Sequence, residues 1–64
     1  MQVFQQRVVD EKVQLDDKIS RLKPFLNSDK VKILVADERI RMIKQLDLME
    51  KYSAILGERI SNFQ

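Results

Sequence analysis

Hydrophobic side chains recur at steps of four and three along the first part of the chain. Steps of this size keep side chains on one face of a helix. The line comprises Phe4, Val8, Glu11, Leu15, Lys18, Leu22 and Phe25. Glu11 and Lys18 are its polar members, and polar residues facing a partner helix fix register or partner at some cost in stability. We predict a helix that kinks or ends close to Pro24, because proline lacks a backbone donor and crowds the preceding turn.

A second stripe of the same kind runs through the C-terminal part of the chain. Its members are Met42, Leu46, Met49, Ser53, Leu56, Ile60 and Phe63. A neighbouring row on the same helix holds Gln45, Leu48, Tyr52, Ile55 and Arg59. Gly57 interrupts the pattern at a cost of about 1 kcal/mol against Ala. It marks either a close approach by another helix or a ligand, or a tolerated weak position.

The segment between the two stripes predicts a turn. Residues 27–29 are Asn-Ser-Asp, a cluster that bonds its own backbone and favours turns and helix starts. Residues 31–35 alternate like a strand, but one isolated strand would have nothing to pair with. We therefore expect a short helical turn that begins at Ser28 or Asp29. The acidic pair at 37–38 then marks the start of the second helix, whose positive end favours carboxylates.

Together these segments predict an all-α fold. A single domain over residues 1–64 forms an antiparallel helical hairpin with a short helical segment in the connection. One stripe closes the hairpin, and the second row on the longer helix stays uncovered. Below about 70–80 residues a lone core seldom gives a comfortable stability margin. Because the chain has no cysteine for a disulfide and no histidine or cysteine for a structural zinc, we expect it to form a homo-oligomer.

Composition narrows the classes of partner. The net charge of +2 is too mild for a protein that coats nucleic acid but favours small anionic ligands. Acidic and basic residues are mixed along both helices, which argues against DNA or RNA polymers. No run approaches the roughly 20 apolar residues of a membrane span, and no secretory signal is expected. We predict a soluble intracellular protein, and the absence of cysteine fits a reducing cytosol.

The residue types needed for catalysis are scarce. The chain has no histidine or cysteine, and its single glycine excludes a phosphate-cradling glycine loop. Asp16 and Asp17 are neighbours, so on a helix they point about 100° apart and do not form an acid–base pair. Metal-ligand spacing is missing as well. We expect a protein that is not an enzyme and that uses no cofactor and no metal.

Cations and aromatic rings are the remaining candidates for ligand binding. Tyr52 and Arg59 are two turns apart on one helix face, and a ring with a guanidinium suits the base and the phosphate of a nucleotide. Arg7 and Lys18, eleven apart, share a face of the first helix. Alternatively, Tyr52 packs in an interface, and Arg59 pairs with an acidic neighbour or caps the last carbonyls. Phe25 is most simply a plug at the open end of the hairpin, although rings near loops also stack on bases.

Two stretches of the chain carry a family resemblance. The first holds Gln6-Arg7-Val8-Val9-Asp10-Glu11-Lys12, Leu15-Asp16-Asp17-Lys18-Ile19, Leu22 and Phe25; the second holds Gln45-Leu46, Met49, Tyr52, Ile55-Leu56 and Arg59-Ile60. Together they resemble the helical hairpin of phage anti-CBASS and anti-Thoeris proteins, which also occurs as short orphan proteins of tailed and crAss-like phages. The resemblance runs from about Gln5 to Ile60. One departure is Pro24, which stands before Phe25 in place of an ordinary helix former.

The resemblance implies a function. Members of that family are not enzymes; they form homo-oligomers, typically hexamers, and hold cyclic nucleotide signals made by bacterial immune synthases. It therefore implies a phage immune-evasion protein in the cytoplasm of the infected host that sequesters cyclic di- or trinucleotides without cleaving them. The expected ligand-binding residues are Arg7, Lys18, Phe25, Tyr52 and Arg59, contributed by neighbouring chains. The alternative, from another class, is a small structural or protein-binding coiled-coil adaptor of a phage.

Overall fold

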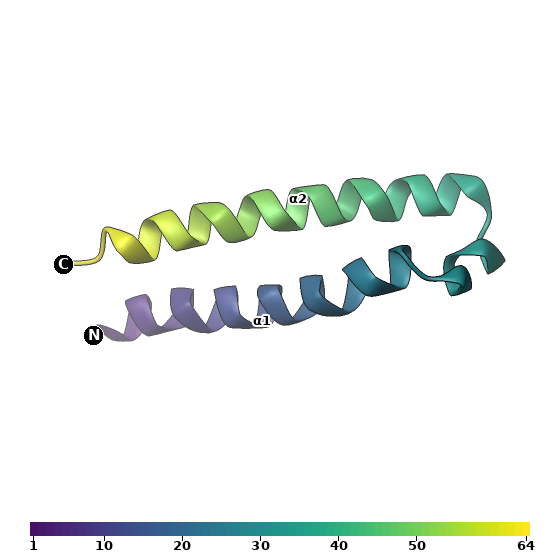
Figure 1. Ribbon diagram of the computed structural model, residues 1–64. Coiled ribbons are helices and arrows are strands. Elements are labelled where there is room, and N and C mark those ends of the chain that lie inside the picture. Colours follow the sequence, from purple (N-terminus) through teal and green to yellow (C-terminus); the bar gives the residue numbers. More distant parts are fainter.

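Two long helices lie side by side in the computed structural model, which describes residues 1–64 (Figure 1). Helix α1 spans Val3–Leu26 and α2 spans Ala36–Ser61, with the 3-10 helix η1, Asp29–Ile33, between them. The helices run antiparallel, so both termini lie at one end and the connection lies at the other (Figure 1). The molecule is a rod whose Cα atoms extend over 46 × 15 × 14 Å. The predicted all-α hairpin with a short helical segment in its connection is confirmed.

Helix α1 begins and ends where nearby side chains satisfy its free backbone groups. At its start, the Gln2 backbone N–H donates to Gln5 Oε1 at 2.9 Å, which is one half of a capping box. At its end, α1 continues for two residues past Pro24. Ser28 Oγ then donates to the carbonyl of Phe25 at 2.7 Å. The predicted end of the first helix near Pro24 is confirmed.

The connection is helical and not extended. The 3-10 helix starts at Asp29, so the predicted short helical turn is confirmed and the strand-like alternation of residues 31–35 does not form a strand. Helix α2 follows after Val35, with Asp37 and Glu38 in its first turn. Their carboxylates lie where the unpaired N–H groups of the helix create partial positive charge.

Helix α2 turns its predicted stripe toward α1. Ser53 and Leu56 are buried, and Leu56 is fully so. The other members are partly buried: Met42, Leu46, Met49, Ile60 and Phe63. Every member of the neighbouring row is exposed: Gln45, Leu48, Tyr52, Ile55 and Arg59. Both predictions for this helix are confirmed.

Helix α1 faces α2 along a different line from the predicted one. The buried and partly buried residues on that line are Gln5, Val8, Lys12, Leu15, Ile19, Leu22 and Leu26. Glu11 and Lys18 are exposed, so the prediction that they lie on the line facing α2 is wrong, and Phe4 is 63% exposed. Rotation of α1 by about one residue replaces these two charged groups with Ile19 and the aliphatic stem of Lys12. This rotation is favourable because it leaves Glu11 and Lys18 in water and packs Ile19 and the stem of Lys12 toward α2.

A polar cluster lies at the middle of the interface between the helices. Lys12 Nζ donates to Asp16 Oδ2 at 2.8 Å and to Ser53 Oγ at 2.9 Å. Ser53 Oγ in turn donates to Asp16 Oδ1. The hydrogen bond from Lys12, followed by that from Ser53, lowers the pKa of Asp16 below its ordinary value. Because all three groups are satisfied only in one alignment of the helices, the cluster fixes the register of the hairpin.

Gly57 lies beneath the side chain of Lys12. A Cβ added to Gly57 would lie 3.4 Å from Lys12 Cε, which is an ordinary van der Waals contact. The backbone of Gly57 does not need a positive φ. Within one hairpin, Gly57 is therefore a tolerated weak position and not a site that only glycine can occupy.

The hairpin buries very little of its apolar surface. Only 4 of 64 residues are buried, and just two of these, Val8 and Leu56, are hydrophobic. Large side chains that remain exposed include Val13 (63%), Leu48 (65%) and Ile55 (54%). A core of this size leaves a stability margin that association would increase. Neither helix has a stretch that is both long enough and apolar enough to span a membrane.

Candidate functional site

Tyr52 shows which side of the hairpin carries the candidate residues. Its hydroxyl donates a hydrogen bond across the helix interface to Glu11 Oε2, and Tyr52 is 44% exposed. This contact brings the faces of α1 and α2 that hold Glu11 and Tyr52 next to each other. We call this surface the Tyr52 side. By helical spacing it comprises Phe4, Arg7, Glu11, Gln14, Lys18 and Phe25 of α1 with Arg41, Gln45, Leu48, Tyr52, Ile55 and Arg59 of α2.

All five predicted ligand-binding residues belong to the Tyr52 side. Lys18 and Phe25 follow Glu11 at intervals of seven, and Arg7 precedes it by four; Arg59 follows Tyr52 by seven. Residues at these intervals share a helix face. Along the rod, however, they are spread out: at 1.5 Å per residue, Arg7 and Phe25 are about 27 Å apart. One hairpin therefore aligns these side chains but does not gather them around one point.

Phe25 lies at the closed end of the hairpin, beside the connection, and not at its open end. It is partly buried and one residue before the last residue of α1. The prediction of a plug at the open end is wrong, because Phe25 precedes the turn and the open end is formed by the two termini (Figure 1). Its ring still has an exposed portion next to the connection.

Three cations on the Tyr52 side have no ion-pair partner within the hairpin. Six ion pairs form in the structure, and none of them involves Arg7, Lys18 or Arg59. The carbonyls near the end of α2 are bonded instead by Ser61 and Asn62. Arg59 therefore neither pairs with an acidic neighbour nor caps the helix. Unpaired, exposed cations of this kind remain available to an anionic ligand.

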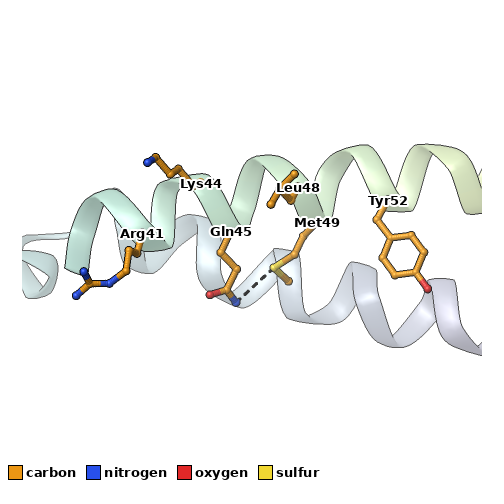
Figure 2. Close-up of a pocket in the computed structure, with 6 residues that line it drawn as sticks. All are labelled: Arg41, Lys44, Gln45, Leu48, Met49 and Tyr52. Carbon is orange, nitrogen blue, oxygen red and sulfur yellow. Dashed lines mark hydrogen bonds between the residues drawn. The ribbon is translucent and has the colours of Figure 1, made fainter. Parts of the chain in front are cut away.

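A groove runs along α2 between Arg41 and Tyr52. Its volume is about 530 Å³, and its lining residues are Arg41, Lys44, Gln45, Leu48, Met49 and Tyr52 (Figure 2). Leu48 and Met49 make the middle of the groove apolar. Figure 2 shows the Tyr52 ring at one end, reaching toward α1, and Arg41 at the other.

The polar groups of the groove are weakly engaged. Arg41 Nε contacts Glu38 Oε1 at 3.3 Å, and Lys44 forms no ion pair. The Gln45 amide donates to Met49 Sδ at 3.7 Å, and a thioether sulfur is a weak acceptor. These groups can therefore exchange their present partners for a ligand at little cost.

Apolar side chains are exposed on both long sides of the rod. Phe4, Leu48 and Ile55 accompany Tyr52 on its side. Val13 follows the inward residue Lys12, and Ile43 follows the inward residue Met42, so each points about 100° away from the helix interface. Both lie on the surface opposite the Tyr52 side, which we call the Val13 side. Val13 is 63% and Ile43 57% exposed. The hairpin thus has two separate surfaces that favour contact with other molecules.

The one arrangement that resembles catalytic chemistry is the cluster of Lys12, Asp16 and Ser53. Ser53 has an acidic and a basic neighbour in space that sequence spacing did not reveal. However, the ammonium of Lys12 donates to the hydroxyl, and the lowered pKa of Asp16 makes its carboxylate a weaker base. Ser53 also faces the opposite helix and is only 8% exposed. No group of three or more acidic, His or Cys side chains is placed to hold a metal ion.

The comparison with protein families decides what this hairpin is. A family model described as Sequestin matches residues 2–62, nearly the whole chain. The chain belongs to the Sequestin family. This is the anti-CBASS and anti-Thoeris family of cyclic nucleotide sponges, so the family inferred from the sequence resemblance is confirmed. No curated protein and no solved structure matches the chain significantly.

Membership of the Sequestin family indicates a protein that binds and sequesters and does not catalyse. It also indicates that the bound partner is a small signal molecule. A sequestering protein needs surface groups that hold a ligand, and on this hairpin unpaired cations, an exposed ring and a groove occur together on the Tyr52 side.

Three features of the Tyr52 side were not predicted from the sequence. Glu11 was assigned to the helix interface, whereas it holds the Tyr52 hydroxyl. Arg41 and Lys44 were not considered, although they precede Leu48 by seven and four residues and thus share its face. Extending the exposed row toward the start of α2 at these intervals would have found both cations.

Proposed function

We propose that this chain is a phage immune-evasion protein that binds cyclic di- or trinucleotides made by bacterial immune synthases. It holds these signals without cleaving them, in the cytoplasm of the infected bacterium, and so keeps the downstream effector inactive. The observation that carries the proposal is the Sequestin match over residues 2–62. The chemistry of the Tyr52 side supports the same conclusion independently.

Cyclic oligonucleotides combine flat bases with phosphate charges, and the Tyr52 side offers groups suited to both. Tyr52 provides an aromatic face for stacking, and Arg7, Lys18 and Arg59 have no protein partner for their charge. Phe25 provides a second ring. Because one hairpin spreads these groups along its length, we propose that each pocket is assembled from neighbouring chains.

We propose that the assembled form is a homo-hexamer. Two exposed apolar surfaces, the Tyr52 side and the Val13 side, allow each chain to contact more than one neighbour, which supports an assembly larger than a dimer. Light scattering at micromolar concentration measures the mass directly. The substitution Ile55→Glu should reduce that mass, whereas Ile33→Glu in the connection makes the same chemical change at an 83% exposed position and should not. A folded wild-type monomer would contradict the proposal.

A thermal-shift panel of cyclic nucleotides tests ligand binding. A ligand at 100 times its dissociation constant stabilises the protein by about 2.7 kcal/mol, which is easily seen for a chain of this size. We expect at least one cyclic di- or trinucleotide to raise the unfolding temperature. Linear mononucleotides at the same phosphate concentration serve as the matched control. Equal shifts for both would indicate non-specific binding of anions, and no shift would contradict the proposal.

The second candidate function is a small structural or protein-binding coiled-coil adaptor of a phage. The exposed apolar row of α2 favours it, because such a row also suits a partner helix. The same panel separates the two candidates, since an adaptor would show no stabilisation by any cyclic nucleotide.

A further inference from the structure

The groove along α2 differs in charge from one end to the other. Arg41 and Lys44 lie at the end nearer the connection, Leu48 and Met49 line the middle, and Tyr52 closes the other end. Glu11, which accepts the hydrogen bond of the Tyr52 hydroxyl, adds a carboxylate beside that closed end. The groove is therefore basic at one end and aromatic with an adjacent negative charge at the other.

This gradient dictates how an anionic, flat ligand would lie. Phosphate groups are attracted to Arg41 and Lys44 and repelled by the carboxylate of Glu11. A base stacks on the ring of Tyr52 and packs against the apolar middle of the groove. The amino groups of a base can then donate to the free oxygen of Glu11, and the Gln45 amide can turn from Met49 toward the ligand.

The dimensions of the groove suit this arrangement. Lys44 and Tyr52 are eight residues apart, about 12 Å along the helix axis. The volume of about 530 Å³ lies within the range of known small-molecule sites.

We propose that this groove binds one nucleotide unit of a cyclic oligonucleotide, with a phosphate at Arg41 and Lys44 and the base on Tyr52. The proposal rests on the proposed function and adds to it a site, an orientation and three further residues, Glu11, Arg41 and Lys44. A second copy of the chain, which we expect to contact the Tyr52 side around Ile55, is a poorer occupant of the groove itself. It would have to cover Arg41 and Lys44. Of these two cations only Arg41 has an ion-pair partner, Glu38, and that pair is exposed.

The site is tested by removing the basic end of the groove. The double variant Arg41→Gln/Lys44→Gln is compared with wild type and with Arg21→Gln/Lys30→Gln. The control matches it in net charge: Arg21 is an exposed arginine in one ion pair, as Arg41 is, and Lys30 is an exposed lysine in none, as Lys44 is. Isothermal titration uses cyclic di-AMP, 3′,3′-cyclic GMP–AMP and cyclic tri-AMP, and light scattering gives the mass of each variant.

We expect the groove variant to bind at least about tenfold more weakly than wild type, as when a charge-assisted hydrogen bond is lost, and to keep its mass. The control should retain its affinity. Unchanged affinity in the groove variant, or equal loss in both variants, would overturn the site. A fall in mass would identify the groove as an interface between copies. If wild type binds none of the three nucleotides, the proposed function fails, and this site fails with it.

The orientation has a separate test in Glu11→Gln, which keeps an acceptor for Tyr52 and removes the charge. With the base at that end, the affinity should stay within about threefold of wild type or fall, because no phosphate is near. An affinity more than about threefold higher would place a phosphate beside Glu11 and overturn the orientation.

Discussion

At the scale of single residues, the pairing of charges distinguishes structural cations from those available to a ligand. Six of the twelve Lys and Arg side chains form ion pairs within the hairpin. Among the unpaired ones, Arg7, Lys18 and Arg59 belong to the Tyr52 side, and Lys44 lines the groove there. Lys12, in contrast, is held by Asp16 and Ser53 in the helix interface. Substitution of Arg7, Lys18, Lys44 or Arg59 should therefore change ligand binding without affecting the fold.

Replacing Arg59 by Ala should therefore weaken binding of a cyclic nucleotide while the assembly stays intact. The expected loss is about 1.5–3 kcal/mol, typical of a hydrogen bond to a charged group. Isothermal titration measures the affinity, and light scattering measures the mass. Arg21→Ala, which removes an exposed arginine paired with Asp17, is the control and should bind normally. Unchanged affinity of the Arg59 variant would mean that Arg59 is only a surface cation near the helix end.

The Lys12–Asp16–Ser53 cluster should make stability depend on pH in the acidic range. Because the pKa of Asp16 is lowered in the folded state, ionised Asp16 stabilises the fold above its unfolded pKa. That contribution is lost as the pH falls through the lowered pKa. The urea midpoints of wild type and Asp16→Asn should therefore differ by a constant amount from pH 5 to 7 and converge below about pH 4.

The control for this measurement is Asp29→Asn. Asp29 lies in the connection with its side chain 96% exposed and takes no part in the helix interface. Its variant should follow wild type at each pH. A difference between wild type and Asp16→Asn that persists undiminished at low pH would mean that the carboxylate charge does not contribute to the fold.

At the scale of elements, the sequence predicts α2 better than α1. In α2 a single line of apolar residues, from Met42 to Phe63, has no competitor, because the neighbouring row contains Gln45 and Arg59. In α1, Ile19 lies beside the predicted line that includes Lys18, so two adjacent lines have similar apolar content. Which line faces α2 depends on contacts between the helices, such as the hydrogen bond from Lys12 to Ser53. These contacts exist only in the packed pair of helices, so the sequence of α1 alone does not reveal them.

For the candidate site, the arrangement of residues on each helix was predictable from the sequence, whereas the arrangement between the helices was not. Helical spacing alone places Tyr52 and Arg59 on one face, and Arg7 with Lys18 on another. That these two faces lie next to each other follows from the contact between Glu11 and Tyr52, which depends on the rotation of α1. The groove depends on side-chain conformation along α2, which spacing does not specify.

Gly57 provides a test of the α2 helix itself. Gly57→Ala should stabilise the protein by about 0.5–1 kcal/mol, because Ala has the higher helix propensity and its Cβ fits beside Lys12. Urea denaturation at a fixed protein concentration measures the change. Ala54→Gly, an opposite change at an exposed position of the same helix, should cost a similar amount. Destabilisation by Gly57→Ala would show that another chain or a ligand approaches this glycine closely.

At the scale of the whole molecule, a rod with little core and two exposed apolar surfaces would link the proposed sequestration to the proposed assembly. In the proposed assembly, a hairpin with 4 buried residues would gain stability from its neighbours, and the same contacts would bring its separated cations and rings near those of other chains. Pockets built in this way need no enclosed cavity within one chain. The number of ligands held should then rise in proportion to the number of assembled chains.

Sequestration without turnover, as proposed, would separate this protein from a nuclease. The chain contains no His or Cys, and the lowered pKa of Asp16 makes the carboxylate beside Ser53 a weak general base. A cyclic nucleotide incubated with the protein and released by heat should therefore be recovered intact and active on its effector. The free nucleotide should fall in proportion to the protein added and then stay constant with time. Mass spectrometry detects any linear product; more than one linear molecule per site, in a preparation free of contaminating nuclease, would show that the protein catalyses cleavage.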